Sequence, residues 1–149
     1  MSTVIEFNSK SDEYGWLSNF WPVPIEVEGR VWPTVEHWFQ GAKFLTGDPE
    51  LAEKVRTCKT AAGAKKLGRT RSTGFRSDWN NVREEVMLQG LRLKFAAGNE
   101  LAERLIATGS AELKEKAAWD SYWGTGRTGK GRNRMGALLM KVRQELTNQ

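Results

Sequence analysis

A carboxylate stands among the largest apolar side chains of the segment EGRVWPTVEHWFQGAKF, residues 28 to 44. In a helix over this segment, Glu36 falls in the first turn, where the helix dipole favours an ionised carboxylate. Glu36, Gln40 and Lys43 recur at helical spacing along one flank of the apolar stripe. A carboxylate in this position suits a general base or an electrostatic stabiliser. The local pattern alone favours a simpler interpretation, an acidic first-turn residue with a solvated lysine beside it.

A glycine-rich loop, GTGRTGKGRN at residues 124 to 133, precedes a predicted helix. Glycines let backbone N–H groups turn toward an anion, and the helix N-terminus adds a positive dipole. The loop is no Rossmann motif, because AAWDSYW precedes it in place of a hydrophobic strand. It is no P-loop, because Gly131 follows Lys130 where Ser or Thr is required. The pattern favours a phosphate cradle of no named class over a flexible surface loop with solubilising charges.

Asp120 lies within WDSYWG, residues 119 to 124, between aromatic side chains and directly before the glycine-rich loop. A bond between a sugar and a base breaks through an oxocarbenium-like transition state, which needs negative charge near the anomeric carbon. Glu36 and Asp120 could supply that charge, unless Asp120 is only a turn residue among core aromatics. The side chains that could grip the leaving base are Trp79, Tyr122 and Trp123.

The composition favours an anionic partner. The chain has 23 basic and 18 acidic residues, a formal net charge of +5 and a pI near 9.5. Such a charge suits binding of phosphate, nucleotide or nucleic acid. Charge alone, however, favours the simpler interpretation of a mildly basic protein that has no such partner. Seven tryptophans suit stacking on a flat ligand or plugging of a loop-covered core. A basic stretch over residues 65 to 76 is expected to be a solvated face more than a nucleic-acid contact.

Cysteine and histidine are too scarce for the sites they usually build. The single cysteine excludes a disulfide framework and a Cys-based zinc cluster, and the single histidine argues against a His-rich metal site. We therefore expect no metal. No apolar run follows a basic start, and none approaches the roughly 18 residues of a membrane span, so we expect a cytoplasmic protein. The length of 149 residues predicts a single domain over residues 1–149.

The elements that must position these residues are mostly helical. We predict a short strand at residues 4–7 and a hairpin over residues 24–33 that turns at Glu28-Gly29. Predicted helices run over residues 35–45, from Asp48-Pro49, up to Gly68, over 79–97, from Asn99 to Gly109, and over 133–146. Residues 110–118 are ambiguous. The fold class is α+β, predominantly helical, with a small N-terminal β-hairpin or sheet.

Several separated motifs occur in a recognisable order. They are YGWLSNFWPVPIEVEGRVWPTVEHWFQGAKF, GRTR with a later DW, LRLKF, and DSYWGTGRTGKGRNRMGALLMKVRQEL. Together they resemble the YbiA-like, or NADAR, superfamily from about residue 5 to residue 146. Two positions depart from the family pattern: Trp38 stands where tyrosine is expected, and Trp119 is an additional aromatic before the aspartate. Both bear on the shape of a base pocket.

The resemblance implies a compact, mostly helical domain and an activity. Members that resemble YbiA are N-glycosidases that cleave the bond between ribose phosphate and the aminopyrimidine in early riboflavin-pathway intermediates. Other members resemble enzymes that remove ADP-ribose from guanine. No metal or redox cofactor is implied.

The family motifs also imply particular site residues. Its motif glutamate falls on Glu36 and its motif aspartate on Asp120, which we take as the catalytic pair. Which carboxylate positions water and which stabilises the oxocarbenium stays open. The expected substrate-binding residues are Asn19, Lys43, Trp79, Tyr122, Trp123, Gly126, Gly129, Lys130 and Asn133.

The sequence therefore predicts a metal-independent N-glycoside hydrolase. Its substrate would be a phosphorylated, nucleotide-like small molecule or ADP-ribosylated guanine in nucleic acid. The alternatives are an ADP-ribosyl-guanine glycohydrolase, a non-catalytic module that binds ADP-ribose or NAD, and, last, a nucleic-acid-binding protein. No membrane partner is expected. The sequence does not fix the oligomeric state, and a monomer is expected.

Overall fold

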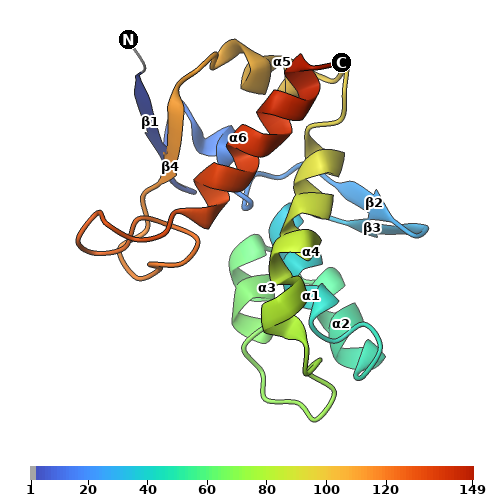
Figure 1. Cartoon of the computed structure of the whole chain (residues 1–149). Coiled ribbons are helices and arrows are strands. Elements are labelled where there is room, and N and C mark those ends of the chain that lie inside the picture. Colours follow the sequence, from blue (N-terminus) through green and yellow to red (C-terminus); the bar gives the residue numbers. More distant parts are fainter. Residues whose placement is uncertain (1–2) are drawn as a thin grey trace. The chain divides into compact units, whose positions relative to one another are not determined.

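Along residues 3–149, which this computed structural model describes, six α-helices accompany four short strands (Figure 1). The prediction of a predominantly helical α+β fold is confirmed. The contacts divide the chain into two compact units. The central unit is Pro22–Lys94, and the terminal unit joins the N-terminal stretch up to Trp21 with Phe95–Gln149. That residues 1–149 form a single domain stays a prediction.

The central unit begins with the predicted hairpin. Strands β2 (Ile25–Val27) and β3 (Arg30–Trp32) pair antiparallel. The two turn residues are Glu28, at a φ of 50°, and Gly29, at a φ of 81°. Two left-handed residues in a row match the right-handed twist of the flanking strands, so the predicted turn is confirmed.

Four helices follow in the central unit: α1 (Val35–Ala42), α2 (Pro49–Arg56), α3 (Ala61–Leu67) and α4 (Trp79–Lys94). Helix α1 packs against the other three, so each of its eight residues is buried. Side-chain oxygens of Thr34, Asp48 and Thr60 accept backbone N–H groups and start the first three helices. The predicted start of α1 is therefore confirmed, although the helix ends at Ala42.

The predicted end of α4 was also too late. The helix stops at Lys94 because the chain then turns toward Gly98, whose φ of 89° no helical residue adopts.

The terminal unit contains strands β1 (Val4–Phe7) and β4 (Glu112–Glu115), the short 3₁₀ helix η1 (Gly15–Leu17), and helices α5 (Glu100–Ala107) and α6 (Arg134–Thr147). Strands β1 and β4 pair in parallel, with Val4 opposite Glu112, and α6 packs on β4 and α5 (Figure 1). The ambiguous residues 110–118 thus contain a strand. None of the helices described for residues 3–149 has the length and apolar character to cross a membrane.

Candidate active site

Glu36 and Gln40 form a buried pair on successive turns of α1. Gln40 Nε2 donates a hydrogen bond of 2.6 Å to Glu36 Oε2. The two residues are only 7% and 6% exposed. A carboxylate is kept in such surroundings only with partners, because burial of a lone charge is costly. The amide of Gln40 therefore fixes where the carboxylate of Glu36 points.

Lys43 is the C-cap residue directly after α1 and carries the balancing charge. Its Nζ donates to Gly68 O at 3.2 Å and lies 5.9 Å from the ring centre of Trp79 and 6.0 Å from that of Phe39. Burial lowers the pKa of Lys43, the charge of Glu36 raises this pKa, and the charge of Arg69 lowers it. Lys43 and Glu36 are therefore electrically coupled.

Two aromatic rings form the apolar side of the site around Glu36, Gln40 and Lys43. The centroids of Phe39 and Trp79 are 5.0 Å apart, with the rings tilted by 58°. Trp79 is the first residue of α4 and is buried. We call Glu36, Phe39, Gln40, Lys43 and Trp79 the α1 cluster. It brings together three of the predicted site residues, Glu36, Lys43 and Trp79, around one carboxylate, one ammonium and flat apolar faces.

Phe39 and Gln40 are the two members of the α1 cluster that the sequence did not predict as site residues, and Gln40 is the polar one. Its Oε1 has no hydrogen-bond partner within the described part of the chain. This oxygen lies against Gly68, where a Cβ would overlap it, so position 68 accepts only glycine without a shift. The spacing of four residues between Glu36 and Gln40 was the available signal.

The terminal unit holds the other predicted residues. Asn19 follows η1 and is buried. The glycine loop, residues 119–133, contains near its start Asp120, whose Oδ1 accepts the N–H groups of Tyr122 at 3.0 Å and Trp123 at 2.8 Å. This carboxylate therefore shapes the turn that presents the two aromatic rings, whose centroids are 5.0 Å apart.

Asn133 ends the glycine loop in the left-handed region, at a φ of 49°. Its Oδ1 accepts Glu115 N at 3.0 Å, and its Nδ2 donates to Leu113 O at 2.9 Å. Both functions of this amide therefore hydrogen-bond the backbone of β4. The geometry assigns Asn133 a role in holding the loop to the strand, whereas its predicted contact with substrate stays a prediction.

The start of α6 differs from the phosphate cradle expected there. The N–H groups of Asn133, Arg134 and Met135 donate to carbonyls of residues 124, 122 and 123, each at 3.0 Å. These amides cannot also point at an anion. A Cβ on Gly131 would lie 2.6 Å from the carbonyl carbon of Thr125, which shows how closely the loop folds back on itself.

A pocket of about 400 Å³ remains on the glycine loop. Its lining includes Gly126, Arg127, Thr128 and Lys130. The guanidinium of Arg127 lies 4.5 Å from the ring centre of Trp119, which is 86% exposed. Gly126 and Gly129 adopt φ angles of 69° and 78° and turn the chain around this pocket. The predicted phosphate site on the glycine loop therefore depends on the cationic side chains of Arg127 and Lys130, and not on the backbone amides at the start of α6.

No metal ligand set is found among residues 3–149, where no three His, Cys, Asp or Glu side chains come together. That the reaction needs no metal stays a prediction. In the α1 cluster, the acidic side chain of Glu36 and two aromatic side chains are buried beside the half-buried Lys43. Such a group can stabilise positive charge on a sugar and hold a flat ring.

Comparison with known proteins identifies a family and several relatives. The model of the NADAR domain family matches residues 6–147. The N-glycosidase YbiA of Escherichia coli is 46% identical over 144 residues, which are 97% of this chain and 89% of that protein. An N-glycosidase of Nostoc punctiforme is 35% identical over 97% of this chain and 94% of its own length.

Two further similarities concern a longer protein and a solved structure. A riboflavin biosynthesis protein of Vibrio vulnificus is 43% identical over 98% of this chain, which corresponds to 39% of that longer protein. The NMR structure of the E. coli protein YbiA superposes with a TM-score of 0.87 and 46% identity, covering 99% of this chain and 87% of that one.

Proposed function

Because the chain belongs to the NADAR domain family, we propose that it is an N-glycosidase acting on a base linked to a ribose phosphate. The names of its relatives in Escherichia coli and Nostoc punctiforme support the reaction type. The observation that carries the proposal is the α1 cluster, because it keeps a carboxylate buried, oriented by Gln40 and coupled to Lys43.

The proposed reaction is a hydrolysis at the anomeric carbon. The bond between C1′ and the base nitrogen breaks, and its electron pair leaves with the base. The oxygen of water bonds to C1′ while Glu36 takes one of its protons, which finally reaches the nitrogen of the released base. The negative charge of Glu36 also stabilises the positive charge that develops on the sugar.

The other side chains of the α1 cluster bind and orient. Gln40 is a positioning residue, because its hydrogen bond sets the direction of the Glu36 carboxylate. Lys43 offers a cation to an oxygen of the substrate, and the faces of Phe39 and Trp79 suit a flat base. We assign Asp120 to shaping the glycine loop, which leaves Glu36 as the single catalytic carboxylate.

The proposed substrate is an aminopyrimidine ribose phosphate of the riboflavin pathway. It is supported by the name of the Vibrio vulnificus relative, a riboflavin biosynthesis protein that is 43% identical. The phosphate is proposed to bind at Lys130 and Gly126, which line the pocket on the glycine loop, and at Gly129, which turns the chain beside them. We also propose that the protein acts as a monomer in the cytoplasm, without a metal.

A second candidate substrate is ADP-ribosylated guanine in nucleic acid. The net charge of +5 and the exposed Trp119 beside Arg127 favour it, because basic side chains and exposed rings suit nucleic acid.

A paired hydrolysis assay separates these possibilities. One reaction contains the phosphoribosylamino-pyrimidine and the other an oligonucleotide with ADP-ribosyl guanine, and mass spectrometry detects the released base or sugar. We expect cleavage of the pyrimidine compound. Cleavage of the oligonucleotide alone would establish the second candidate. Intact ligand after long incubation, with binding retained, would reject an enzyme and indicate a binding module.

A further inference from the structure

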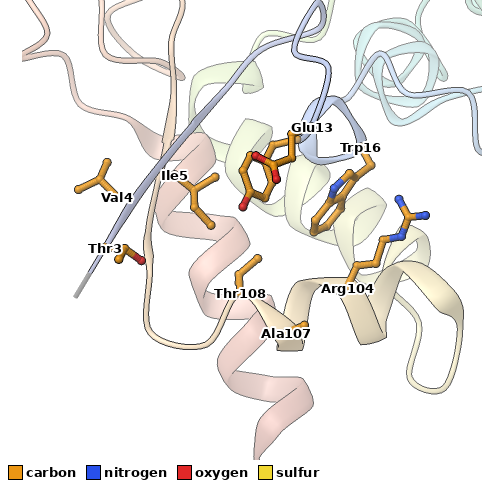
Figure 2. A pocket seen from close by; sticks show the side chains of 9 residues that line it. Thr3, Val4, Ile5, Glu13, Trp16, Arg104, Ala107 and Thr108 are labelled. Atoms are coloured by element: carbon orange, nitrogen blue, oxygen red, sulfur yellow. The ribbon is translucent and has the colours of Figure 1, made fainter. Parts of the chain in front are cut away.

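A second groove lies in the terminal unit and is lined by none of the predicted site residues. Its volume is about 700 Å³, within the range of small-molecule pockets. Figure 2 shows side chains from three parts of the unit around it: Thr3 directly before β1 and Ile5 within it, Trp16 from η1, and Arg104 and Thr108 from α5 and the residue after it. The proposed N-glycosidase reaction uses none of these residues.

One wall of this groove is aromatic. Trp16 is only 6% exposed, and its ring centroid lies 6.4 Å from that of Tyr14, with the planes at 52°. The two rings form a corner that suits a flat ring. Within residues 3–149, no hydrogen bond engages Nε1–H of Trp16, although this donor belongs to a nearly buried side chain that lines the groove. The nitrogen itself is not among the buried polar atoms that lack a partner, so this donor is open to solvent and to a ligand.

The wall beside the aromatic corner is cationic. The guanidinium of Arg104 lies 6.0 Å from the ring centre of Trp16, and its Nη2 also donates to Glu100 at 3.1 Å on the exposed side of α5. Figure 2 shows the Arg104 side chain extending next to Trp16. A guanidinium in this place can bind an anion with two parallel hydrogen bonds.

A second cation lies behind the groove. The hydroxyl of Thr108 donates to Leu105 O at 2.6 Å and accepts from Nη1 of Arg143 at 2.8 Å. Arg143 is 8% exposed, and no carboxylate pairs with it in the part of the chain that the structure describes. Burial accordingly lowers the pKa of Arg143. The C-terminal end of α5 offsets part of this charge through its dipole.

An acidic side chain limits where an anion can lie. Glu13 lines the groove together with Tyr14, whereas Arg104 and Thr108 line it from α5 and the residue after it. An anion is therefore attracted to the α5 side and repelled from Glu13. A flat ring against the aromatic corner and an anionic group toward Arg104 satisfy both preferences, along with the open donor of Trp16.

We propose that this groove is a second binding site, and that it takes a nucleoside monophosphate with its base against Tyr14 and Trp16 and its phosphate toward Arg104 and Thr108. The volume accommodates a ligand of that size. The proposal is independent of the N-glycosidase reaction, because it uses no residue of the α1 cluster or of the glycine loop.

Nuclear magnetic resonance of the tryptophan indole N–H groups tests the proposal. The chain has 16.8 kDa and seven tryptophans, so the indole signals form a small, separate set. Comparison with Trp16→Phe identifies the Trp16 signal. The full chain is titrated with AMP, and separately with adenosine and with inorganic phosphate.

We expect AMP to shift the Trp16 signal with saturation, and adenosine and phosphate each to bind at least about tenfold more weakly, because each lacks one half of the contacts. Arg104→Gln should weaken AMP binding by about tenfold or more, since it removes a charge-assisted hydrogen bond. Arg71→Gln changes the charge equally at an exposed residue of the central unit and should leave the titration unchanged.

Three results would overturn the proposal. These are a Trp16 signal that AMP does not move, equal affinity for AMP and adenosine, and an Arg104→Gln variant that binds AMP as the original chain does. A titration repeated in Glu36→Gln separates this site from the proposed active site. An unchanged Trp16 response there supports the second site whether or not the N-glycosidase proposal holds, and a lost response would overturn it.

Discussion

The α1 cluster and the glycine loop carry similar kinds of residues but use them differently. In the α1 cluster, Glu36 is hydrogen-bonded by a side chain, Gln40, and is electrically coupled to Lys43. In the glycine loop, Asp120 and Asn133 hydrogen-bond the backbone of the loop and of β4. The first arrangement orients a charge in a buried place. The second fixes the path of the chain.

This difference indicates which residues take part in the reaction and which stabilise the fold. A carboxylate that accepts two backbone N–H groups at a turn does what turn aspartates ordinarily do. A carboxylate buried beside an amide and an ammonium costs folding energy, and an active site is a common reason for that cost. Substitutions in the α1 cluster should therefore affect activity more than stability, and those in the glycine loop the reverse.

The largest expected effect belongs to Glu36→Gln. The change removes the charge and keeps the shape, so we expect the rate of hydrolysis to fall by about 10²–10⁴-fold, as for loss of a general base. The rate is measured with the substrate that the paired assay identifies. Circular dichroism and urea unfolding should show a folded chain. A variant with full activity would refute the catalytic assignment of Glu36.

Asn133→Ala should mainly affect stability. The change removes two hydrogen bonds to β4 and places alanine at a left-handed φ, so we expect the free energy of unfolding to fall by about 2–3 kcal/mol. Urea denaturation measures the loss. The folded fraction should keep its activity per molecule. Lost activity with unchanged stability would instead support the predicted contact between Asn133 and substrate.

The coupling within the α1 cluster predicts a smaller, pH-dependent effect. Burial lowers the pKa of Lys43 and the charge of Glu36 raises it, so Glu36→Gln should lower this pKa further. The ¹³Cε resonance of Lys43, followed against pH, measures the change. Because the folded pKa lies below the unfolded one, the folded state binds fewer protons between them, and the free energy of unfolding rises with pH there. A Lys43 titration that is the same in both proteins would show that the two groups are not coupled.

Asp120→Asn should have the smallest effect. Asparagine keeps an oxygen that accepts the N–H groups of Tyr122 and Trp123, so we expect a loss of less than about 1 kcal/mol in stability and most of the activity to remain. Thermal unfolding and the hydrolysis assay measure the two quantities. A large loss of activity in this folded variant would show that Asp120 is catalytic, as first predicted. The α1 cluster and the glycine loop would then not differ in role.

Local features were predictable from the sequence because their causes are local. Glu28 and Gly29 turn the hairpin, and Thr34 caps α1, as the residue types indicated. The spacing on α1 also placed Glu36 beside Gln40 and Lys43. What the spacing did not reveal is the burial of this flank, which arises because α2, α3 and α4 cover α1.

Long-range features could not be read in the same way. The pairing of β1 with β4 joins segments far apart in the sequence, and no pattern in residues 110–118 identified the partner. The type of a residue likewise does not reveal the hydrogen-bond partners of its side chain. Asn133 is still predicted to bind substrate. The sequence did not indicate that its amide hydrogen-bonds β4, or that the amides at the start of α6 hydrogen-bond the glycine loop.

The parallel pair of β1 and β4 has a consequence for synthesis on the ribosome. The central unit is one contiguous stretch, Pro22–Lys94, and can fold once that stretch has emerged. Strand β1 is made earlier, yet Val4 has no partner until Glu112 follows. The first strand therefore has no β-partner until residue 112 has been made, and the terminal unit closes only after α6 has emerged.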